Sequence, residues 1–381
     1  MLEEKKMKRG SVLLMLVMLA VLFQAGNAEV MAGYQSYLPD ITYINNNGEY
    51  DARSLNATLY VSDNEIWYSG YAAPSGSWLL HTNVSAEDLS LLTFPDAPGS
   101  NPIVHSIAKI DTTLMLGFID AENQTGTIGL FENGRMTYHK LPDTAKIMRM
   151  SSTPKGILAL GVIYQEKENV STLYSAMFSA VEGKIFEIAE ISADMPVDGY
   201  ALSTSKCAAD DDLYYIQANC GRVERLQPEK TLICYNATGL RQWSIALPET
   251  IAVERMSASG GNVFLYGMAG RLDEYDVLVD QQATVLCYSR DGIEKWQKTF
   301  DSPERFYFGI SAEGQCIAAA GMDGAGKWNI CSINTDGTVD SMTSVDFSSE
   351  IYVRGIFDTN GKAAMVLGTT ENQLFLFRVP I

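Results

Sequence analysis

Three histidines are the residues that first raise the question of metal chemistry. They are His81, His105 and His139, and none stands in an HExxH or HxH arrangement. A catalytic zinc ion normally needs two or three converging imidazoles. We therefore interpret the three as surface or strand histidines and predict no metal site and no catalytic residue among them.

Residues 309–314 are the stretch most similar to the nucleophile motif of a serine hydrolase. In the sequence GISAEG the second glycine follows Ser311 one residue too late for the G-x-S-x-G turn of serine hydrolases. The stretch also falls on a predicted strand and its turn. An ordinary hairpin explains it.

Two acidic clusters raise the question of calcium, which takes about six to eight oxygen ligands, usually from Asp-rich loops. One is Asp210-Asp211-Asp212, and the other is Asn334-Thr335-Asp336-Gly337 with Asp340. Both coincide with predicted tight turns, where Asp and Asn are favoured by their own backbone hydrogen bonds. We predict no cofactor, and calcium at either cluster is the alternative.

Glycoside hydrolysis is harder to assess, because it needs only two carboxylates about 5 to 10 Å apart. The chain has 46 Asp and Glu residues, so chance pairs are inevitable and the sequence selects none. A hydrolase or lyase acting on carbohydrate stays open as an alternative function.

Two long loops are predicted between strands, at residues 221–229 and 271–282. Long loops on a rigid scaffold are where binding residues usually lie. We place a tentative binding patch in the second loop, and a merely solvated loop is the alternative. The patch residues are Arg271, Asp273, Glu274, Tyr275 and Asp276.

The elements that must position these residues are β-strands in a degenerate repeat. Its most legible member is an apolar run that recurs every 44 to 56 residues, with starts at Glu65, Thr113, Ile157, Leu213, Val263, Gln315 and Lys362. Six of the seven runs end at or near a glycine, which lets another backbone approach closely. The next run is followed in five units by a tight-turn signal, at Asn133-Gly134, Glu182-Gly183, Thr238-Gly239, Asp291-Gly292 and Asp336-Gly337.

Each unit holds four short strands, as in one blade of a β-propeller. The units are residues 52–94, 103–141, 146–192, 199–248, 252–300, 305–347 and 351–381. The last lacks an outer strand, and residues 40–45 have strand character without a partner. We predict an all-β fold in which residues 29–381 form one domain, a seven-bladed propeller of four-stranded blades. Residues 40–45 close it by completing the last blade, and six or eight blades are the alternatives.

Two stretches carry a family resemblance: TLICYNATGLRQW at residues 231–243 and TVLCYSRDGIEKW at residues 284–296. They resemble the repeat of PQQ-like propellers, in which a tryptophan docks on the next blade. The resemblance implies a PQQ-like or WD40-like propeller. The family's quinone dehydrogenases carry a neighbouring cysteine pair that this chain lacks, so the quinone is not expected.

The first 28 residues read as a secretory signal peptide. Four cations precede an apolar run at residues 12–23, and Gly26-Asn27-Ala28 supplies the small residues of a cleavage site. The run is shorter than the roughly 20 apolar residues that span a bilayer. We expect cleavage after Ala28 and a secreted or extracellular protein of bacterial type, or a membrane-tethered one if the signal is retained.

The six cysteines all lie in the second half of the chain, at Cys207, Cys220, Cys234, Cys287, Cys316 and Cys331. An even number in an exported chain invites disulfides. However, the predicted strand registers place no two of them opposite each other. We predict mostly free, buried thiols.

The formal net charge of −18 repels phosphate backbones and anionic lipid surfaces. Nucleic acid and peripheral membrane binding are therefore not expected. The leading hypothesis is an exported, non-enzymatic propeller that binds a protein or a glycan outside the cytoplasm, as a monomer.

Overall fold

A computed structural model describes the strands and most of the tight turns of the chain. The described residues are 29–34, 43–45, 48–50, 59–62, 65–72, 76–83, 89–94, 96–100, 102–120, 122, 125–141, 145–165, 170–180, 182–187, 205–220, 229–275, 277–300, 311–313, 316–322, 328–345, 352–358, 363–369 and 374–380. None of them forms a helix, so none belongs to a long apolar helix that could cross a membrane. The predicted signal peptide lies outside these residues.

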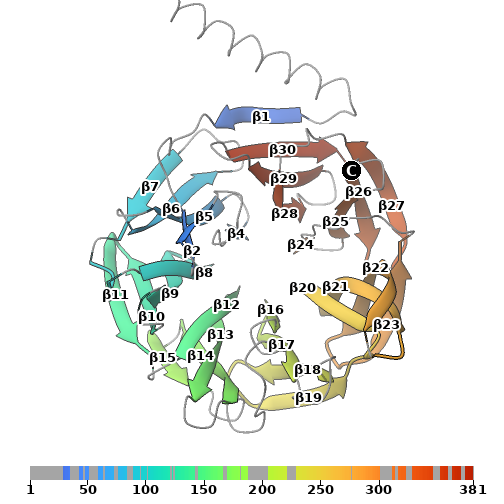
Figure 1. Cartoon of the computed structure of the whole chain (residues 1–381), viewed down its shortest axis with the longest axis horizontal. Helices are drawn as coiled ribbons and strands as arrows, with labels where there is room; N and C mark the ends of the chain where they lie inside the picture. The colour runs from blue at the N-terminus through green and yellow to red at the C-terminus, as the bar shows by residue number, and fades with distance from the viewer. Residues whose placement is uncertain are drawn as a thin grey trace, which may run out of the picture. The chain divides into compact units, whose positions relative to one another are not determined.

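The chain divides into two compact units, and residues 40–301 form the larger one. Its described strands form four-stranded antiparallel sheets in chain order, together with one two-stranded hairpin (Figure 1). The sheets are β4 to β7 (Leu59–Ser62, Glu65–Ala72, Gly76–Asn83, Leu89–Thr93), β8 to β11 (Pro102–Ile110, Thr113–Asp120, Gly126–Glu132, Arg135–Lys140), β12 to β15 (Ala145–Thr153, Gly156–Gln165, Val170–Ser179, Lys184–Glu187), β16 to β19 (Lys206–Asp210, Leu213–Cys220, Glu229–Asn236, Arg241–Ala246) and β20 to β23 (Ile251–Ser259, Asn262–Leu272, Leu278–Ser289, Glu294–Thr299). The hairpin is β2 and β3 (Tyr43–Asn45, Gly48–Tyr50).

The second unit comprises residues 1–39 and 302–381 and holds two further four-stranded sheets among its described residues. One is β24 to β27 (Ser311–Glu313, Cys316–Met322, Trp328–Asn334, Val339–Val345). The other combines β28, β29 and β30 (Tyr352–Asp358, Ala363–Thr369, Leu374–Pro380) with β1 (Glu29–Tyr34). An N-terminal strand therefore completes the last sheet, as predicted.

The prediction that residues 40–45 supply this strand was wrong. Glu29 lies opposite Arg378 and Met31 opposite Leu376, so the first residues after the expected signal peptide make the pairing. Within residues 40–45, Tyr43–Asn45 pairs instead with Gly48–Tyr50. The two intervening residues are both asparagine, a type that suits two-residue turns. A local hairpin thus takes up the strand character of this segment.

Every predicted apolar run forms the second strand of a four-stranded sheet: β5, β9, β13, β17, β21, β25 and β29. The five tight-turn glycines lie between the third and fourth strands, with positive φ values of 75°, 61°, 79°, 79° and 86° at Gly134, Gly183, Gly239, Gly292 and Gly337. The repeat read from the sequence is therefore a repeat of antiparallel four-stranded sheets. The union of both units into one domain with seven blades stays a prediction.

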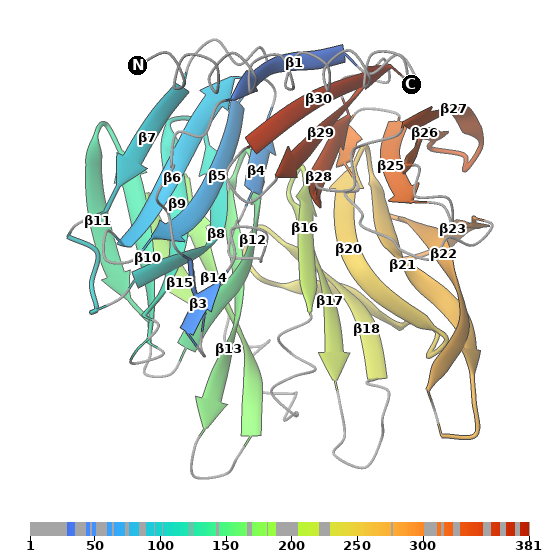
Figure 2. The same cartoon turned by 45° about the horizontal axis from the view of Figure 1, so that its top comes forward.

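In the larger unit, the first strands of successive sheets lie side by side. β8 contacts β4 and β12, and β16 contacts β12 and β20 (Figures 1 and 2). Apolar clusters fill the spaces between neighbouring sheets. Tyr214 of β17 packs with Leu158 and Leu160 of β13, whereas Tyr215 packs with Ile251 and Val263 of the sheet that follows. The β16–β19 sheet is thus buried on both faces, and its first strand, β16, lies beside the first strands of its two neighbours.

Bulges interrupt several of these inner strands. The register shifts between Val104 and Ser106 in β8, between Ile147 and Arg149 in β12, and between Val253 and Arg255 in β20. At each bulge the second strand carries one of the predicted glycines: Gly117, Gly161 and Gly267. A Cβ at Gly267 would collide with the carbonyl oxygen of Ala252, and one at Gly161 with that of Lys146. The glycines are therefore needed because the bulged backbone passes close to them.

Replacing Gly267 with alanine should destabilise the protein by about 2 kcal/mol, because the added methyl group overpacks against backbone that cannot rotate away. Gly183→Ala is the matched control. No atom lies within 4 Å of its added Cβ, so only the strain of its φ of +61° remains, worth about 1 kcal/mol. Urea unfolding of both variants measures the difference. Equal losses would contradict the close-approach explanation.

The two segments with the family resemblance fold alike. Cys234 lies opposite Trp243, Cys287 lies opposite Trp296, and the register shifts directly after each cysteine. The Trp243 Nε1–H donates a 2.8 Å hydrogen bond to the carbonyl of Arg290, in the turn between β22 and β23. Its indole also covers Gly292. Trp243 therefore docks on the next sheet, as the resemblance implied.

Candidate functional site

Three neighbouring inner strands carry a cation at the same register position. Arg149 on β12, Lys206 on β16 and Arg255 on β20 each lie four residues before the last residue of their strand. Because these strands stand side by side, the equal register brings the three side chains to one level. We call Arg149, Lys206 and Arg255 the cation row.

The bulges help to direct the cation row. In β12 and β20 the register shift comes directly before Arg149 and Arg255. An extra residue in one strand bends it and re-aims the side chains that follow. Arg255 is exposed, and Arg149 and Lys206 are partly buried, so the row reaches solvent along the inner edge of the sheets.

The charges of the row act on one another. Burial and the positive charges of Arg149 and Arg255 together lower the pKa of Lys206 to about 7, against the opposing effect of Glu254. Burial, together with the charge of Arg255, also lowers the pKa of Arg149. The electrostatic potential at this level is therefore positive, although the protein as a whole carries a large negative charge.

Two further basic residues lie near the row, His105 on β8 and Lys146 on β12. Burial and the charges of Arg149 and Lys146 lower the pKa of His105 to about 4, so this imidazole is neutral at pH 7. His105 is the extra residue at the β8 bulge. The described part of the inner edge thus offers guanidinium and ammonium groups, a neutral imidazole, and Glu254 as the nearby carboxylate.

This arrangement is suited to binding an anion. Arginine presents a planar fork of donors that fits a carboxylate, sulfate or phosphate group in a bidentate way. An anion placed between the cations would also relieve the repulsion that lowers the pKa of Lys206. The residues of the row therefore have the chemistry needed to bind acidic groups.

The neighbouring thiol takes no obvious part in this chemistry. Burial raises the pKa of Cys207 to about 12, despite the charges of Arg149 and Lys206. A thiol with so high a pKa is a poor nucleophile at pH 7. Cys207, Cys234 and Cys287 are all free, as predicted, and Cys220, Cys316 and Cys331 lie outside the described side chains.

The tentative binding patch lies on a hairpin rather than on a long loop. β21 continues to Leu272, and β22 begins at Leu278, opposite it. The predicted loop over residues 271–282 is therefore wrong, because the strands keep pairing beyond the end of the apolar pattern. The other long loop lies outside the described residues, apart from Glu229, which begins β18.

The patch residues are held by local interactions. Arg271 contacts Asp280 across the hairpin, and Asp273 Oδ1 accepts 2.9 Å hydrogen bonds from the backbone N–H groups of Tyr275 and Val277. Tyr275 is 66% exposed, Glu274 is exposed, and Asp276 lies outside the described residues. A role for this hairpin tip in binding stays a prediction.

The candidate metal ligands are placed apart or are engaged in turns. His81 stacks on Trp67 with ring centroids 4.0 Å apart, whereas His139 is exposed on β11. Asp210 Oδ2 accepts a 2.7 Å hydrogen bond from the Gly261 N–H, and Asp212 forms an ion pair with Lys155 at 3.3 Å. Among the described residues, no three His, Cys, Asp or Glu side chains are grouped as a metal site.

The second acidic cluster likewise forms a turn. Asp336 Oδ1 accepts hydrogen bonds from the backbone N–H and the hydroxyl of Thr338, and these lower the pKa of Asp336. Asp340 belongs to β27, but its side chain is outside the described set.

The cation row was missed in the sequence, although a signal was present. The tripeptide Arg-Met-Ser occurs at residues 149–151 and again at 255–257, at the same distance from the next tight turn. An inner-strand Arg repeated in register indicates a function common to both strands. The third member, Lys206, is not part of such a tripeptide, and only the strand register shows that it belongs to the row.

Comparison by sequence finds no matching family model and no matching curated protein. Comparison of structures is informative. The propeller domain of the Trilobed protease from Pyrococcus furiosus is similar at a TM-score of 0.50 and 10% identity, covering 86% of this chain and 94% of that one. The polysaccharide lyase Uly1 is similar at a TM-score of 0.51 and 10% identity, covering 92% and 95%.

Part of a larger enzyme is similar as well. The acylaminoacyl peptidase of Pyrococcus horikoshii matches at a TM-score of 0.55 and 11% identity, over 91% of this chain and 52% of that one. This chain therefore spans about half the length of that peptidase. At such low identities the likeness concerns the fold alone, and it shows that the chain has the β-propeller fold predicted from its repeats.

Proposed function

We propose that this propeller is an exported binding module that holds an acidic ligand, carried by a glycan or a protein, against the cation row. The observation that carries the proposal is the equal register of Arg149, Lys206 and Arg255 on three adjacent inner strands. Burying a cation beside like charges lowers stability, as indicated by the pKa of Lys206, which is depressed mainly by burial and further by Arg149 and Arg255. A cost of this kind is typical of binding sites.

Export is proposed from the signal-like sequence of residues 1–28. β1 begins at Glu29, directly after the proposed cleavage site at Ala28. Removal of the signal peptide would therefore leave β1 available to pair with β30. Binding outside the cytoplasm fits this arrangement.

A lyase acting on an acidic polysaccharide is the second candidate. A general base works best when its pKa lies near the operating pH, and burial and neighbouring cations bring the pKa of Lys206 to about 7. Arg149 or Arg255 could neutralise the carboxylate next to the proton that is removed. A structurally similar protein, Uly1, is itself a polysaccharide lyase.

The two candidates separate in one set of measurements. Mature protein, residues 29–381, is titrated with alginate, heparin, poly-glutamate and neutral dextran at two salt concentrations. We expect at least one acidic polymer to bind, dextran not to bind, and affinity to fall as salt rises. Absence of salt-dependent binding would refute the proposed function. New absorbance at 232 nm, characteristic of unsaturated uronates, would assign the lyase.

A further inference from the structure

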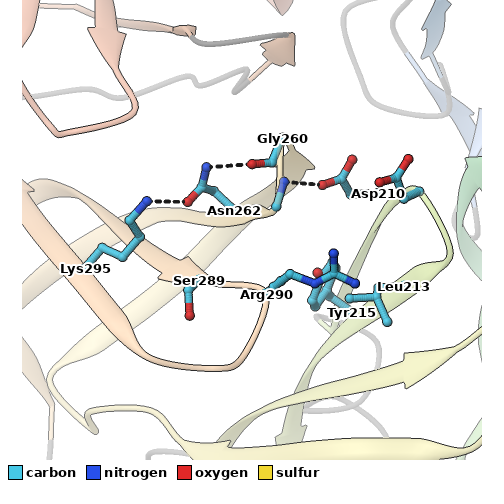
Figure 3. A pocket seen from close by; sticks show the side chains of 10 residues that line it. Asp210, Leu213, Tyr215, Gly260, Asn262, Ser289, Arg290 and Lys295 are labelled. Carbon is cyan, nitrogen blue, oxygen red and sulfur yellow. Dashed lines mark hydrogen bonds between the residues drawn. The ribbon is translucent and has the colours of Figure 1, made fainter.

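A separate polar cleft lies between the sheet β16–β19 and the sheet β20–β23, away from the cation row. Its volume is about 410 Å³, which is within the usual range of small-molecule sites. The turn β16–β17 contributes Asp210 and Asp211, the turn β20–β21 contributes Gly260 and Gly261, and Arg290 comes from the turn β22–β23. Figure 3 shows these side chains around the cleft.

Backbone contacts between the two sheets hold the cleft open in a defined shape. The Gly261 N–H donates to Asp210 Oδ2 at 2.7 Å, and the Arg290 N–H donates to the Gly261 carbonyl at 2.9 Å. On the far side, Lys295 Nζ donates to Asn262 Oδ1 at 2.8 Å. These interactions fix the walls, and the exposed residues Arg290 and Asp211 line the cleft.

Tyr215 supplies the observation that indicates a ligand. The side chain is fully buried and lines the cleft, and its hydroxyl oxygen has no hydrogen-bond partner in the protein. Buried hydroxyls are normally paired. The adjacent Tyr214 follows that rule, since its hydroxyl lies 2.9 Å from Thr153 Oγ1.

The phenol of Tyr215 remains protonated at pH 7, so it can donate a hydrogen bond. Burial is the main cause that raises the pKa of Tyr215 above its ordinary value, and the nearby Asp210 acts in the same direction. Donors and acceptors therefore surround one cleft: the Tyr215 hydroxyl, the Arg290 guanidinium and the carboxylates of Asp210 and Asp211. A ligand that both donates and accepts at closely spaced positions satisfies all of them.

We propose that this cleft binds a neutral sugar residue, with the Tyr215 hydroxyl, the Arg290 guanidinium and the Asp211 carboxylate as its hydrogen-bonding partners. Sugar hydroxyls donate to the carboxylate and accept from the guanidinium and the phenol. Leu213 adds an apolar contact on the same wall. This site is independent of the cation row, because all its residues lie on other strands or at strand ends.

The test uses the mature protein and a panel of neutral sugars: glucose, galactose, mannose, N-acetylglucosamine, maltose, cellobiose and lactose. Thermal shift at millimolar sugar identifies a binder, and calorimetric titration gives its Kd. We expect at least one sugar to bind, and Tyr215→Phe and Arg290→Gln each to weaken it at least tenfold. Tyr214→Phe is the matched control, because it removes the neighbouring buried hydroxyl, which lies 2.9 Å from Thr153 Oγ1 outside the cleft, and should leave Kd unchanged.

Stability of the free protein supplies a second measurement. Removing an unpaired buried hydroxyl should leave Tyr215→Phe at least as stable as the natural protein without sugar. Failure of the whole panel to bind would overturn the proposal, and so would sugar affinity unchanged in Tyr215→Phe or a clearly lowered Tm of that variant. Arg149→Gln should leave sugar binding intact, which keeps this test separate from that of the proposed function.

Discussion

Replacing Arg149 and Arg255 together with glutamine is expected to weaken binding of the acidic polymer at least 100-fold. A hydrogen bond to a charged group contributes about 1.5 to 3 kcal/mol, and a tenfold change in affinity corresponds to about 1.4 kcal/mol. Loss of two such contacts therefore removes two or more orders of magnitude. Each single variant should lose about tenfold or more.

Glutamine keeps much of the length and polarity of arginine but lacks its charge, so the fold should persist. Arg135→Gln is the control, since Arg135 is an exposed cation of the same unit on β11, outside the cation row. Calorimetric titration at low salt compares the variants. If the double variant binds as tightly as the Arg135 control, the acidic ligand does not use the cation row.

The slope of affinity against salt gives an independent check. Each ionic contact that is lost should reduce the dependence of log K on log salt, because fewer counterions are released on binding. The double variant should therefore show both weaker binding and a shallower slope. A lowered affinity with an unchanged slope would point to a disturbed fold instead.

Much of the fold could be predicted because the repeat makes strong local demands. Gly161 and Gly267 are irreplaceable where a bulged backbone passes close by, and Gly134 and Gly292 adopt positive φ values in turns. Such residues mark strand ends regardless of the rest of the sequence. The sequence of the Trp243 segment likewise indicated its docking on the next sheet.

The strand that completes the last sheet could not be predicted by the same means. Residues 40–45 and 29–34 both have strand character, and the choice depends on competition between a local hairpin and a distant edge. Closing a two-residue loop orders far less chain than joining the ends of the protein. The hairpin therefore takes residues 43–45, and β1 pairs with β30.

The candidate site was hidden for a related reason. Arg149, Lys206 and Arg255 are more than 100 residues apart in sequence from first to last, and only strand register shows that they share a level. The sequence indicated the hairpin patch instead, because its charged residues lie in what the sequence predicts to be a long loop. Strand register, not local composition, determines which side chains meet on the inner edge.

Replacing Lys206 with methionine is expected to stabilise the free protein by about 3 kcal/mol at pH 6. Burial and the charges of Arg149 and Arg255 lower the pKa of Lys206 from 10.5 to about 7. At about 1.4 kcal/mol per pKa unit the full shift corresponds to about 5 kcal/mol. Because the side chain is only partly buried, solvent screening reduces this to about 3 kcal/mol. Holding the ammonium in this place therefore opposes folding. Methionine keeps the unbranched shape without the charge.

The stabilisation by Lys206→Met should depend on pH in a defined direction. The unfolded chain keeps the Lys206 proton until pH approaches 10.5, whereas the folded protein releases it near pH 7. Between these values the unfolded state binds more protons, so the stability of the natural protein rises with pH. The advantage of Lys206→Met is thus full below pH 7 and shrinks steadily towards pH 10.

Urea unfolding of both proteins from pH 6 to pH 10, at constant low salt, measures this difference, and groups that titrate in both proteins cancel in the comparison. An advantage that stays constant with pH would show that Lys206 is not held at a lowered pKa. Added acidic ligand should reduce this advantage at pH 6, because it binds the row more tightly where the Lys206 ammonium is present. The charge that weakens the free propeller is therefore the charge that secures its ligand.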